Sequence, residues 1–429
     1  MSWINKAIKK ILPTRVLESY YDLIAYQRSG KRGAKYLKHK EPIRVVFLLY
    51  YPAAWESFSS VYKYMESDER FELLVLAIPK VAMGSKYNEE IDCADTSCED
   101  FCKNIGLNYK NAWSVEKDAW VSLQSIQPDY VFYARPYEEH YPKGFRAHEV
   151  SQYARTCYIP YGYAVQSGRI LHTTYNRTFL SNITLCFFAN KSAIEESIRS
   201  RPLLHVLNKR RWEYLGFPGF DGLFDDSKLC GISKVPYKHV VAWFPRWTVD
   251  DTTNTPSHFF DYCDDFLDFA KSRGDIQLII RPHPLMFSNF ITEGLMTSED
   301  VIEFETRCVQ LGNVHLDNDS NCYTSALSSD VIISDFTSLM MSFLVMNKPV
   351  ISCDEKNQPY TPEGMLMDSA FYHERDWAAI SFRINQLLDG HDDLATKRHE
   401  VLLQLGHDGN AGIRIAERLV DDFRNGSIR

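Results

Sequence analysis

The stretch Ile276-Gln-Leu-Ile-Ile-Arg-Pro-His-Pro284 decides the fold, because it joins a buried strand to a charged loop. Its first five residues are nearly all apolar, which is typical of a strand covered on both faces in a parallel sheet. Arg281 and His283 follow the strand at once, so we expect them at the carboxyl end of the sheet, where open α/β folds bind ligands. The prolines stiffen this loop by fixing φ. The stretch therefore predicts a ligand-binding strand end.

The same alternation of strands and helices extends outward over most of the chain and predicts parallel sheets wrapped by helices. The expected strands are 43–50, 71–78, 130–133, 156–159, 184–188, 239–244, 276–280, 314–316, 330–333 and 349–352. The expected helices include 56–65, 120–126, 191–198, 257–271, 299–311, 322–328, 338–346 and 377–388, and a helical stretch 393–423 that Gly409 and Gly412 break.

A stretch rich in glycine and proline, 215–222, divides this pattern into two similar halves. We therefore expect two Rossmann-like domains facing each other across a cleft, with boundaries at 41–215 and 216–400. A basic segment, 1–40, precedes them and a helix, 401–429, follows them.

The composition describes a globular protein of a reducing compartment. The chain has 429 residues, 45% hydrophobic, and ten cysteines without the spacing of a disulfide framework or a zinc knuckle. Cys93, Cys98 and Cys102 cluster without a nearby histidine, so we expect no metal site. The sequence shows neither a signal peptide nor an apolar run long enough to span a bilayer. These features predict a cytoplasmic protein.

Residues 1–40 differ in charge from the rest of the chain. They hold ten lysines or arginines against Glu18 and Asp22, whereas the whole chain has a net charge of −8. Apolar residues recur at helical spacing between the lysines, at Trp3, Ile4, Ile8, Ile11 and Leu12. This pattern indicates a basic amphipathic helix, either on an anionic membrane surface at the inner face of the cell membrane or packed on its own domain. The acidic remainder argues against nucleic acid as a partner.

A second candidate phosphate site is Ser334-Asp-Phe-Thr-Ser338, between an apolar strand and an apolar helix. The start of a helix offers unpaired N–H groups and a positive dipole end, and Thr337 and Ser338 add hydroxyls. The simpler interpretation is a helix cap supplied by Ser334 or Asp335. At the first stretch, Arg281 suits phosphate oxygens and His283 can donate a proton, while the simpler interpretation is an arginine paired with a carboxylate. Neither a Walker loop nor a GxGxxG motif is present.

Several motifs in order resemble the CDP-glycerol glycerophosphotransferase family, the teichoic-acid and capsule polymerases and primases of GT-B fold. The resemblance covers chiefly residues 210–425. Its motifs are Leu215-Gly-Phe-Pro218 with Asp221, Ala242-Trp-Phe-Pro-Arg-Trp247, Arg281-Pro-His-Pro284, Ile333-Ser-Asp-Phe-Thr-Ser338, Asn347-Lys-Pro-Val-Ile351 and His407-Asp-Gly409.

The resemblance implies transfer of glycerol phosphate or ribitol phosphate from a CDP-linked donor to a hydroxyl of a glycan or polyol-phosphate acceptor, with CMP leaving. It implies an acceptor domain at 41–215, a donor domain at 216–400 and no cofactor besides the CDP-linked substrate. Arg281 and His283 then hold or protonate the donor phosphates. The residues that bind the donor are Arg246, Ser334, Asp335, Thr337 and Ser338.

The chain departs from the family at the residue that activates the acceptor. The family has a histidine in a Trp-His-Gly-Thr-Pro stretch, and the corresponding segment here, Tyr158-Ile-Pro-Tyr-Gly-Tyr163, has Tyr161 in that place. An unperturbed tyrosine, with a pKa of about 10, is a poor base at neutral pH. His172 and His140 are the candidate substitutes, and both also fit as ordinary core or surface histidines.

Other functions stay open within the same architecture. The alternatives are a glycosyltransferase that uses a nucleotide sugar in capsule or lipopolysaccharide synthesis, a UDP-sugar 2-epimerase, and a non-catalytic nucleotide-binding subunit of an envelope assembly complex. The nucleotide that is released, CMP or a uridine nucleotide, distinguishes the enzymes from one another. Binding without release indicates the subunit.

Overall fold

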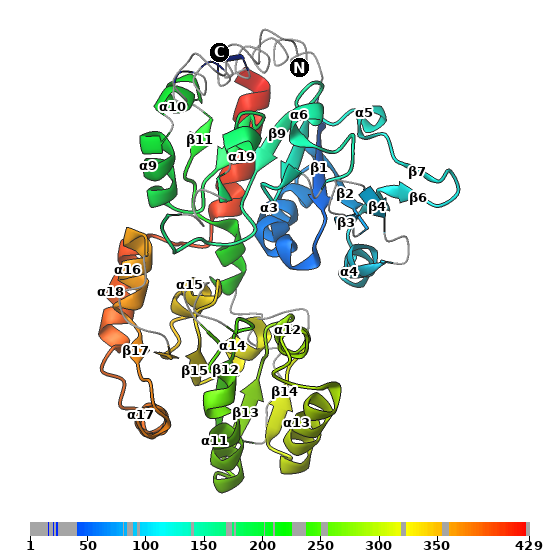
Figure 1. The fold of residues 1–429 in the computed structure, drawn as a ribbon. Coiled ribbons are helices and arrows are strands. Elements are labelled where there is room, and N and C mark those ends of the chain that lie inside the picture. Colours follow the sequence, from blue (N-terminus) through cyan, green and yellow to red (C-terminus); the bar gives the residue numbers. More distant parts are fainter. Residues whose placement is uncertain are drawn as a thin grey trace. The chain divides into compact units, whose positions relative to one another are not determined.

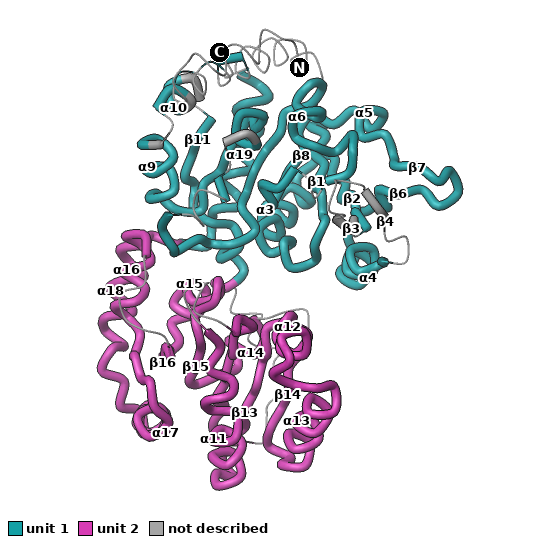
Figure 2. Tube along the Cα trace, in the orientation of Figure 1, with its two compact units in different colours: residues 1–222, 408–429 teal, residues 223–407 magenta. Residues whose placement is uncertain are grey.

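The computed structural model describes residues 16, 20, 23–24, 41–79, 81–83, 89–91, 95–138, 141–168, 174–175, 177–200, 202–208, 211–224, 237–249, 256–318, 323–353 and 360–425. Almost all of the basic segment 1–40, together with Cys93, His140 and His172, lies outside these residues. The chain divides into two units (Figure 2). Unit 1 comprises residues 1–222 and 408–429, and unit 2 comprises residues 223–407.

Unit 1 is built on a sheet with the strand order β11-β10-β9-β8-β1-β2-β5, in which all neighbours are parallel (Figure 1). Its strands are β1 (Ile43–Leu49), β2 (Phe71–Ala77), β5 (Tyr109–Asn111), β8 (Tyr130–Tyr133), β9 (Arg155–Tyr158), β10 (Leu185–Phe187) and β11 (Trp212–Glu213). Two antiparallel hairpins accompany it: β3 (Val81–Met83) with β4 (Glu89–Ile91), and β6 (Trp113–Ser114) with β7 (Ala119–Trp120). The α-helices described in this unit are α3 (Glu56–Glu66), α4 (Ser97–Asn104), α5 (Leu123–Ile126), α6 (Ala147–Val150), α8 (Arg177–Leu180), α9 (Lys191–Ser200), α10 (Pro202–Asn208) and α19 (Ala411–Asn425).

Both faces of this sheet are buried, which explains the continuous apolar run in β1. Successive side chains of a strand point to opposite faces. Val46 and Leu48 join one core cluster, while Phe47 stacks on Phe132 at 4.9 Å and meets Phe58 of α3 edge to face at 5.3 Å. The burial of both faces gives the doubly covered sheet that the sequence predicts.

Unit 2 repeats the plan with the strand order β14-β13-β12-β15-β16-β17, again parallel throughout. Its strands are β12 (His239–Phe244), β13 (Ile276–Ile280), β14 (Val314–Leu316), β15 (Val331–Ser334), β16 (Val350–Ser352) and β17 (Tyr372–His373). Its described helices are α11 (Phe259–Ser272), α12 (Met286–Thr292), α13 (Ser298–Leu311), α14 (Tyr323–Ser328), α15 (Met340–Val345), α16 (Pro362–Asp368), α17 (Trp377–Leu388) and α18 (Ala395–Leu405).

Helices cover both faces of this second sheet. Trp243 of β12 stacks on Phe266 of α11 at 4.4 Å, and the next residue, Phe244, contacts Phe343 of α15 at 4.8 Å. The two-domain α/β class predicted from the sequence is confirmed, since each unit carries a Rossmann-like parallel sheet.

Three local predictions are wrong. The helix expected at 120–126 is confined to α5, because Trp120 pairs with Trp113 in a hairpin. The helix expected at 338–346 begins only at Met340, after a turn. Gly412 does not break a helix but lies inside α19, where a Cβ would come within 2.7 Å of the Ser60 carbonyl carbon of α3. This glycine lets the two helices approach closely.

The observed division of the chain differs from the expected boundaries at its C-terminal end, because residues 408–429 return to unit 1. Asp221 joins the two segments of that unit. Its carboxylate accepts hydrogen bonds from the Ser60 hydroxyl (2.9 Å) and from the backbone N–H groups of Ala411 (3.1 Å) and Gly412 (2.7 Å). Because it is mostly buried, the pKa of Asp221 is raised, and these three donors partly offset that shift.

Within the described residues, no helix is both long enough and apolar enough to cross a bilayer. The described residues also hold no group of three histidine, cysteine or acidic side chains arranged for a metal ion.

Candidate active site

The predicted donor residues of unit 2 follow strands that end side by side. Trp243 is in register with Ile280, Ile280 with Leu316, and Phe244 with Ser334. Because the strands are parallel, the loops that follow them leave the sheet at the same edge. The loops beginning at residues 245, 281, 317 and 335 therefore lie together at the carboxyl edge, as the sequence predicts for a ligand site.

Arg281 is held at this edge by a carboxylate of the neighbouring strand end. Its backbone N–H donates to the carbonyl of Trp243 (2.8 Å), and its Nη1 donates to Asp317 Oδ2 at 2.5 Å. The Asp317 side chain is 3% exposed and also accepts a hydrogen bond from the Ser325 hydroxyl. The arginine–carboxylate pair considered from the sequence is thus present, and it fixes the direction of the guanidinium.

His283 is neutral and has a defined tautomer. Its Nδ1 accepts a hydrogen bond from the backbone N–H of Leu285 (3.2 Å), so the proton of the neutral ring is on Nε2. Burial and, second, the positive charge of Arg246 lower the pKa of His283 from 6.5 to about 4. The ring of Trp247 lies 5.8 Å from the imidazole. At neutral pH the side chain therefore offers an Nε2–H donor rather than a positive charge.

Asp335 is a positioning residue in this structure, because its carboxylate is fully buried. Its Oδ2 accepts hydrogen bonds from the backbone N–H groups of Arg246 (2.8 Å) and His258 (3.3 Å). Arg246 in turn donates from Nη1 to the carbonyl of Phe336 (3.0 Å), and its guanidinium lies over the Phe336 ring. One aspartate thus fastens the loop after β12 and the start of α11 to the loop after β15.

The other residues of the 334–338 stretch lie in different surroundings. Ser334 is fully buried, and its hydroxyl donates to the carbonyl of Asp335 (2.6 Å). Thr337 is partly buried and its Oγ1 accepts from the backbone N–H of Leu339 (3.4 Å), whereas Ser338 is exposed. Because α15 is six residues long and starts at Met340, these residues form a turn before the helix rather than its first turn.

Tyr161 lies in unit 1, after β9. Its backbone N–H donates to the carbonyl of Ala134 (2.9 Å), which fastens it beside the end of β8. Its side chain is 39% exposed, and its ring lies 5.0 Å from the guanidinium carbon of Arg135. His172 and His140, the other residues considered for the acceptor, lie outside the described residues.

Asp317 is a site residue that the sequence reasoning missed. The signal was available, since Asp317 directly follows β14 just as Arg281 follows β13. Its pairing with Arg281 depends on the order of the strands, with β14 beside β13 at the edge of the sheet.

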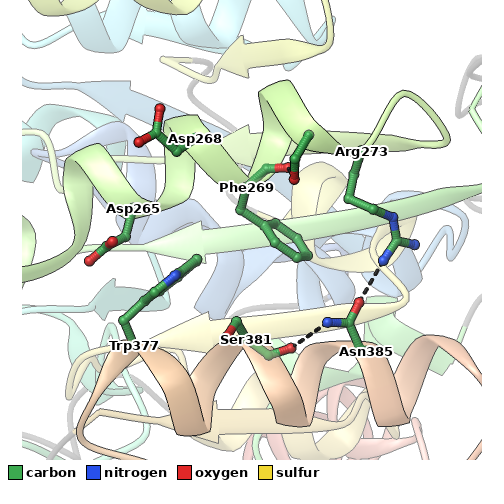
Figure 3. A pocket seen from close by; sticks show the side chains of 8 residues that line it. Asp265, Asp268, Phe269, Arg273, Trp377, Ser381 and Asn385 are labelled. Carbon is green, nitrogen blue, oxygen red and sulfur yellow. Dashed lines mark hydrogen bonds between the residues drawn. The ribbon is translucent and has the colours of Figure 1, made fainter.

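The pocket in Figure 3 contains none of the predicted residues. It has a volume of about 410 Å³ and is lined by residues of α11 and α17 and their neighbours. Three of its polar residues already bind one another, because Arg273 donates to Asn385 (2.5 Å) and Asn385 donates to the Ser381 carbonyl (2.9 Å). We therefore place the chemistry at the strand ends instead.

One family model matches a segment of unit 2 and its approach from unit 1. Residues 192–374 match the family model of CDP-Glycerol:Poly(glycerophosphate) glycerophosphotransferase, a segment that includes Arg246, Arg281, His283 and residues 334–338. No curated protein matches the chain.

Solved structures share the fold at low sequence identity. The wall teichoic acid polymerase TagF is 13% identical over 96% of this chain and 97% of its own, with a TM-score of 0.58. A putative UDP-N-acetylglucosamine 2-epimerase from Listeria monocytogenes is 11% identical over 90% of this chain and 98% of its own, with a TM-score of 0.56. These neighbours have the two-domain GT-B fold. Residues 192–374, somewhat less than half of the chain, therefore resemble the CDP-glycerol:poly(glycerophosphate) glycerophosphotransferase family, and the solved structures at low identity share its two-domain fold.

Proposed function

We propose that the protein transfers glycerol phosphate from CDP-glycerol to a terminal hydroxyl of a polyol-phosphate chain, as in teichoic acid synthesis. The observation that carries the proposal is the gathering of Arg246, Arg281 and His283 at the carboxyl edge of the unit 2 sheet, inside the segment that the family model matches. Two guanidinium groups and an N–H donor suit the negatively charged diphosphate of such a donor.

The reaction is an in-line displacement at phosphorus. The acceptor hydroxyl oxygen forms a bond to the β-phosphorus, and the bond from that phosphorus to the bridging oxygen breaks. The bridging oxygen leaves with the electron pair as part of CMP, and the acceptor proton passes to a base. Positioning and neutralisation of charge dominate such transfers.

In this proposal Arg281, fixed by Asp317, and Arg246, fixed through Asp335, neutralise the diphosphate. His283 donates its Nε2–H to a phosphate oxygen. A strong acid is unnecessary, because the phosphate of the leaving CMP has a second pKa of about 6. The negative charge of a bound diphosphate raises the pKa of His283 above its value in the free protein.

Two further roles complete the donor site. Thr337 and Ser338 supply hydroxyls from the turn before α15, while the buried Ser334 keeps that turn in place. For the acceptor proton we propose His172 rather than Tyr161, because an imidazole has an ordinary pKa near neutral pH, whereas that of a phenol is about 10.

Nucleotide release tests the function directly. The full chain is incubated with CDP-glycerol, CDP-ribitol or UDP-N-acetylglucosamine, with and without a poly(glycerol phosphate) acceptor, and the released nucleotide is separated by chromatography. We expect CMP, released mainly when both CDP-glycerol and acceptor are present. Release of UDP or UMP contradicts the proposal in favour of a sugar enzyme, and binding of CMP without any release favours a non-catalytic subunit.

We also propose that residues 1–40 bring the enzyme to an anionic membrane surface. The support is their sequence, in which ten basic residues accompany an apolar helical stripe. A membrane-bound acceptor chain would then be concentrated near the enzyme.

A further inference from the structure

A cluster of tyrosines surrounds Arg135 at the carboxyl edge of the unit 1 sheet. The guanidinium carbon lies 5.0 Å from the ring centre of Tyr161, 5.2 Å from that of Tyr51 and 5.9 Å from that of Tyr50. These residues follow β1, β8 and β9, which are neighbours in the sheet. Three separate loops therefore converge on one cation at the edge where parallel sheets bind ligands. We call Arg135, Tyr50, Tyr51 and Tyr161 the arginine cage.

The backbone of the cage is fixed by a buried residue. Tyr141 is 1% exposed, and burial raises its pKa well above the ordinary tyrosine value. Hydrogen bonds from the backbone of Arg135 and Ala134 to the Tyr141 hydroxyl oppose that shift. The start of the loop after β8 is thus held in place, which is how a preorganised binding site is built.

The charge of Arg135 is not balanced by a carboxylate in the described part of the chain. Its Nε is buried and makes no hydrogen bond there. Other arginines of unit 1 do have acidic partners: Arg70 contacts Asp68, Arg155 contacts Asp422 and Arg418 contacts Glu213. A half-buried guanidinium with an unsatisfied N–H is costly unless a ligand completes it.

We propose that the arginine cage binds a phosphate group of the acceptor, an inference that rests on the proposed function. The guanidinium fork matches two phosphate oxygens, and the three aromatic rings hold it in one orientation while excluding water from one side. Tyr51 and Tyr161 are 41% and 39% exposed, so they form the open side through which an acceptor enters.

A binding measurement tests the cage without turnover. The wild-type full chain is titrated with glycerol 3-phosphate, with glycerol and with CMP in a calorimeter. The same titrations are made on Arg135→Gln, on Arg135→Lys and on Arg199→Gln. Arg199 serves as the matched control, since its side chain is 75% exposed and pairs with Glu196 in the same unit.

We expect wild type and Arg199→Gln to bind glycerol 3-phosphate and not glycerol. Arg135→Gln should weaken this binding at least about tenfold, on the scale of one lost charge-assisted hydrogen bond. Arg135→Lys should retain part of this binding, because lysine keeps the positive charge but lacks the two parallel N–H donors of the guanidinium. CMP should bind all four proteins equally. Unchanged glycerol 3-phosphate binding in Arg135→Gln, or a loss of CMP binding instead, overturns the proposal.

Steady-state kinetics separate this proposal from the proposed function. If wild type releases CMP with acceptor, Arg135→Gln should raise KM for a poly(glycerol phosphate) acceptor about tenfold or more and leave KM for CDP-glycerol unchanged. An unchanged KM for the acceptor then refutes the proposal for the arginine cage and leaves the proposed function intact. If wild type releases no CMP from CDP-glycerol, the proposed function fails, and the calorimetric test still decides whether the cage binds phosphate. Equal melting temperatures of Arg135→Gln and wild type show that misfolding does not cause the result.

Discussion

Arg281 Nη1 lies 2.5 Å from Asp317 Oδ2, and both side chains are largely buried at the ends of neighbouring strands. A buried ion pair of this kind contributes less to stability than to geometry, because desolvation offsets most of the attraction. Here it aims the guanidinium of a residue that belongs to the proposed donor site.

Breaking this pair should therefore affect both stability and transfer. Arg281→Ala should lower transfer at least about tenfold, as expected for a lost charge clamp. Asp317→Asn should lower the free energy of unfolding by about 3–5 kcal/mol, because it leaves a buried charge without its partner. The double variant Arg281→Met with Asp317→Leu should recover stability and not transfer.

Denaturant unfolding and CMP release measure these two effects separately. Asp264→Asn is the matched control, since it breaks an exposed pair with Arg307 and should change the free energy of unfolding by less than about 1 kcal/mol. Normal transfer in Arg281→Ala would remove that residue from the donor site.

His283→Ala should lower transfer at least about tenfold through the loss of the Nε2–H donor. Since the pKa of His283 is about 4 in the free protein, titration of this histidine should not change kcat/KM between pH 5.5 and 8. Donor binding should raise this pKa, which an imidazole NMR titration with and without CMP would show. An unshifted resonance on adding CMP would contradict contact with phosphate.

The same pKa predicts an effect on stability. Because folding lowers the pKa of His283 from 6.5, its contribution to stability is complete above that value and is lost as the pH falls toward 4. His283→Gln should reduce the loss of stability over this interval, as measured by denaturant unfolding at pH 7, 5.5 and 4.5.

Asp335→Ala should destabilise unit 2 by about 2–4 kcal/mol, because it leaves the N–H groups of Arg246 and His258 without their acceptor. Asp335→Asn keeps an acceptor oxygen and should cost much less. Burial raises the pKa of Asp335, so its ionisation opposes folding increasingly as the pH rises above the ordinary aspartate range. The free energy of unfolding of Asp335→Asn should therefore depend less on pH than that of the wild type, and denaturant unfolding at several pH values measures this difference.

Gly412→Ala should lower the free energy of unfolding of unit 1 by about 1–3 kcal/mol, since the new Cβ meets the Ser60 backbone at 2.7 Å. Gly274→Ala is the control, because nothing lies within 4 Å of a Cβ there, and its effect should stay within about 1 kcal/mol. Thermal melts that fail to separate these variants would contradict the close packing of α19 on α3.

Removal of residues 1–40 should reduce sedimentation of the protein with vesicles that contain anionic phosphatidylglycerol, and the reduction should vanish at high salt. Neutral phosphatidylcholine vesicles provide the control. Equal sedimentation of the two proteins would indicate that this segment packs on its own domain instead.

The sequence predicted the parts of the structure that depend on local pattern. Strands such as β1 and β13 were found because both their faces are buried, whereas β5 (Tyr109–Asn111) is short, polar and at a sheet edge, and carries no such signal. The positions of Arg281 and His283 after their strand followed from the same pattern. The pairing of Arg281 with Asp317 did not, because it arises from strand order, which a single sequence does not encode locally.

The contacts of Tyr161 likewise could not be predicted from the sequence. Tyr161 was recognised as a departure from the family, yet its neighbours Tyr51 and Arg135 come from loops some 110 and 26 residues earlier in the chain. Contacts between loops of neighbouring strands become visible only when the strand order is known.

The hydrogen bonds of Asp221 have a topological consequence. The chain leaves unit 1 just after this carboxylate and re-enters it just before the amides of Ala411 and Gly412, which the same carboxylate binds. In terms of chain connectivity, unit 2 is an insertion whose two attachment points are neighbours in space. Such a host can close over the excised insert with a short linker, and evolution can exchange one insert for another without rebuilding the sheet of unit 1.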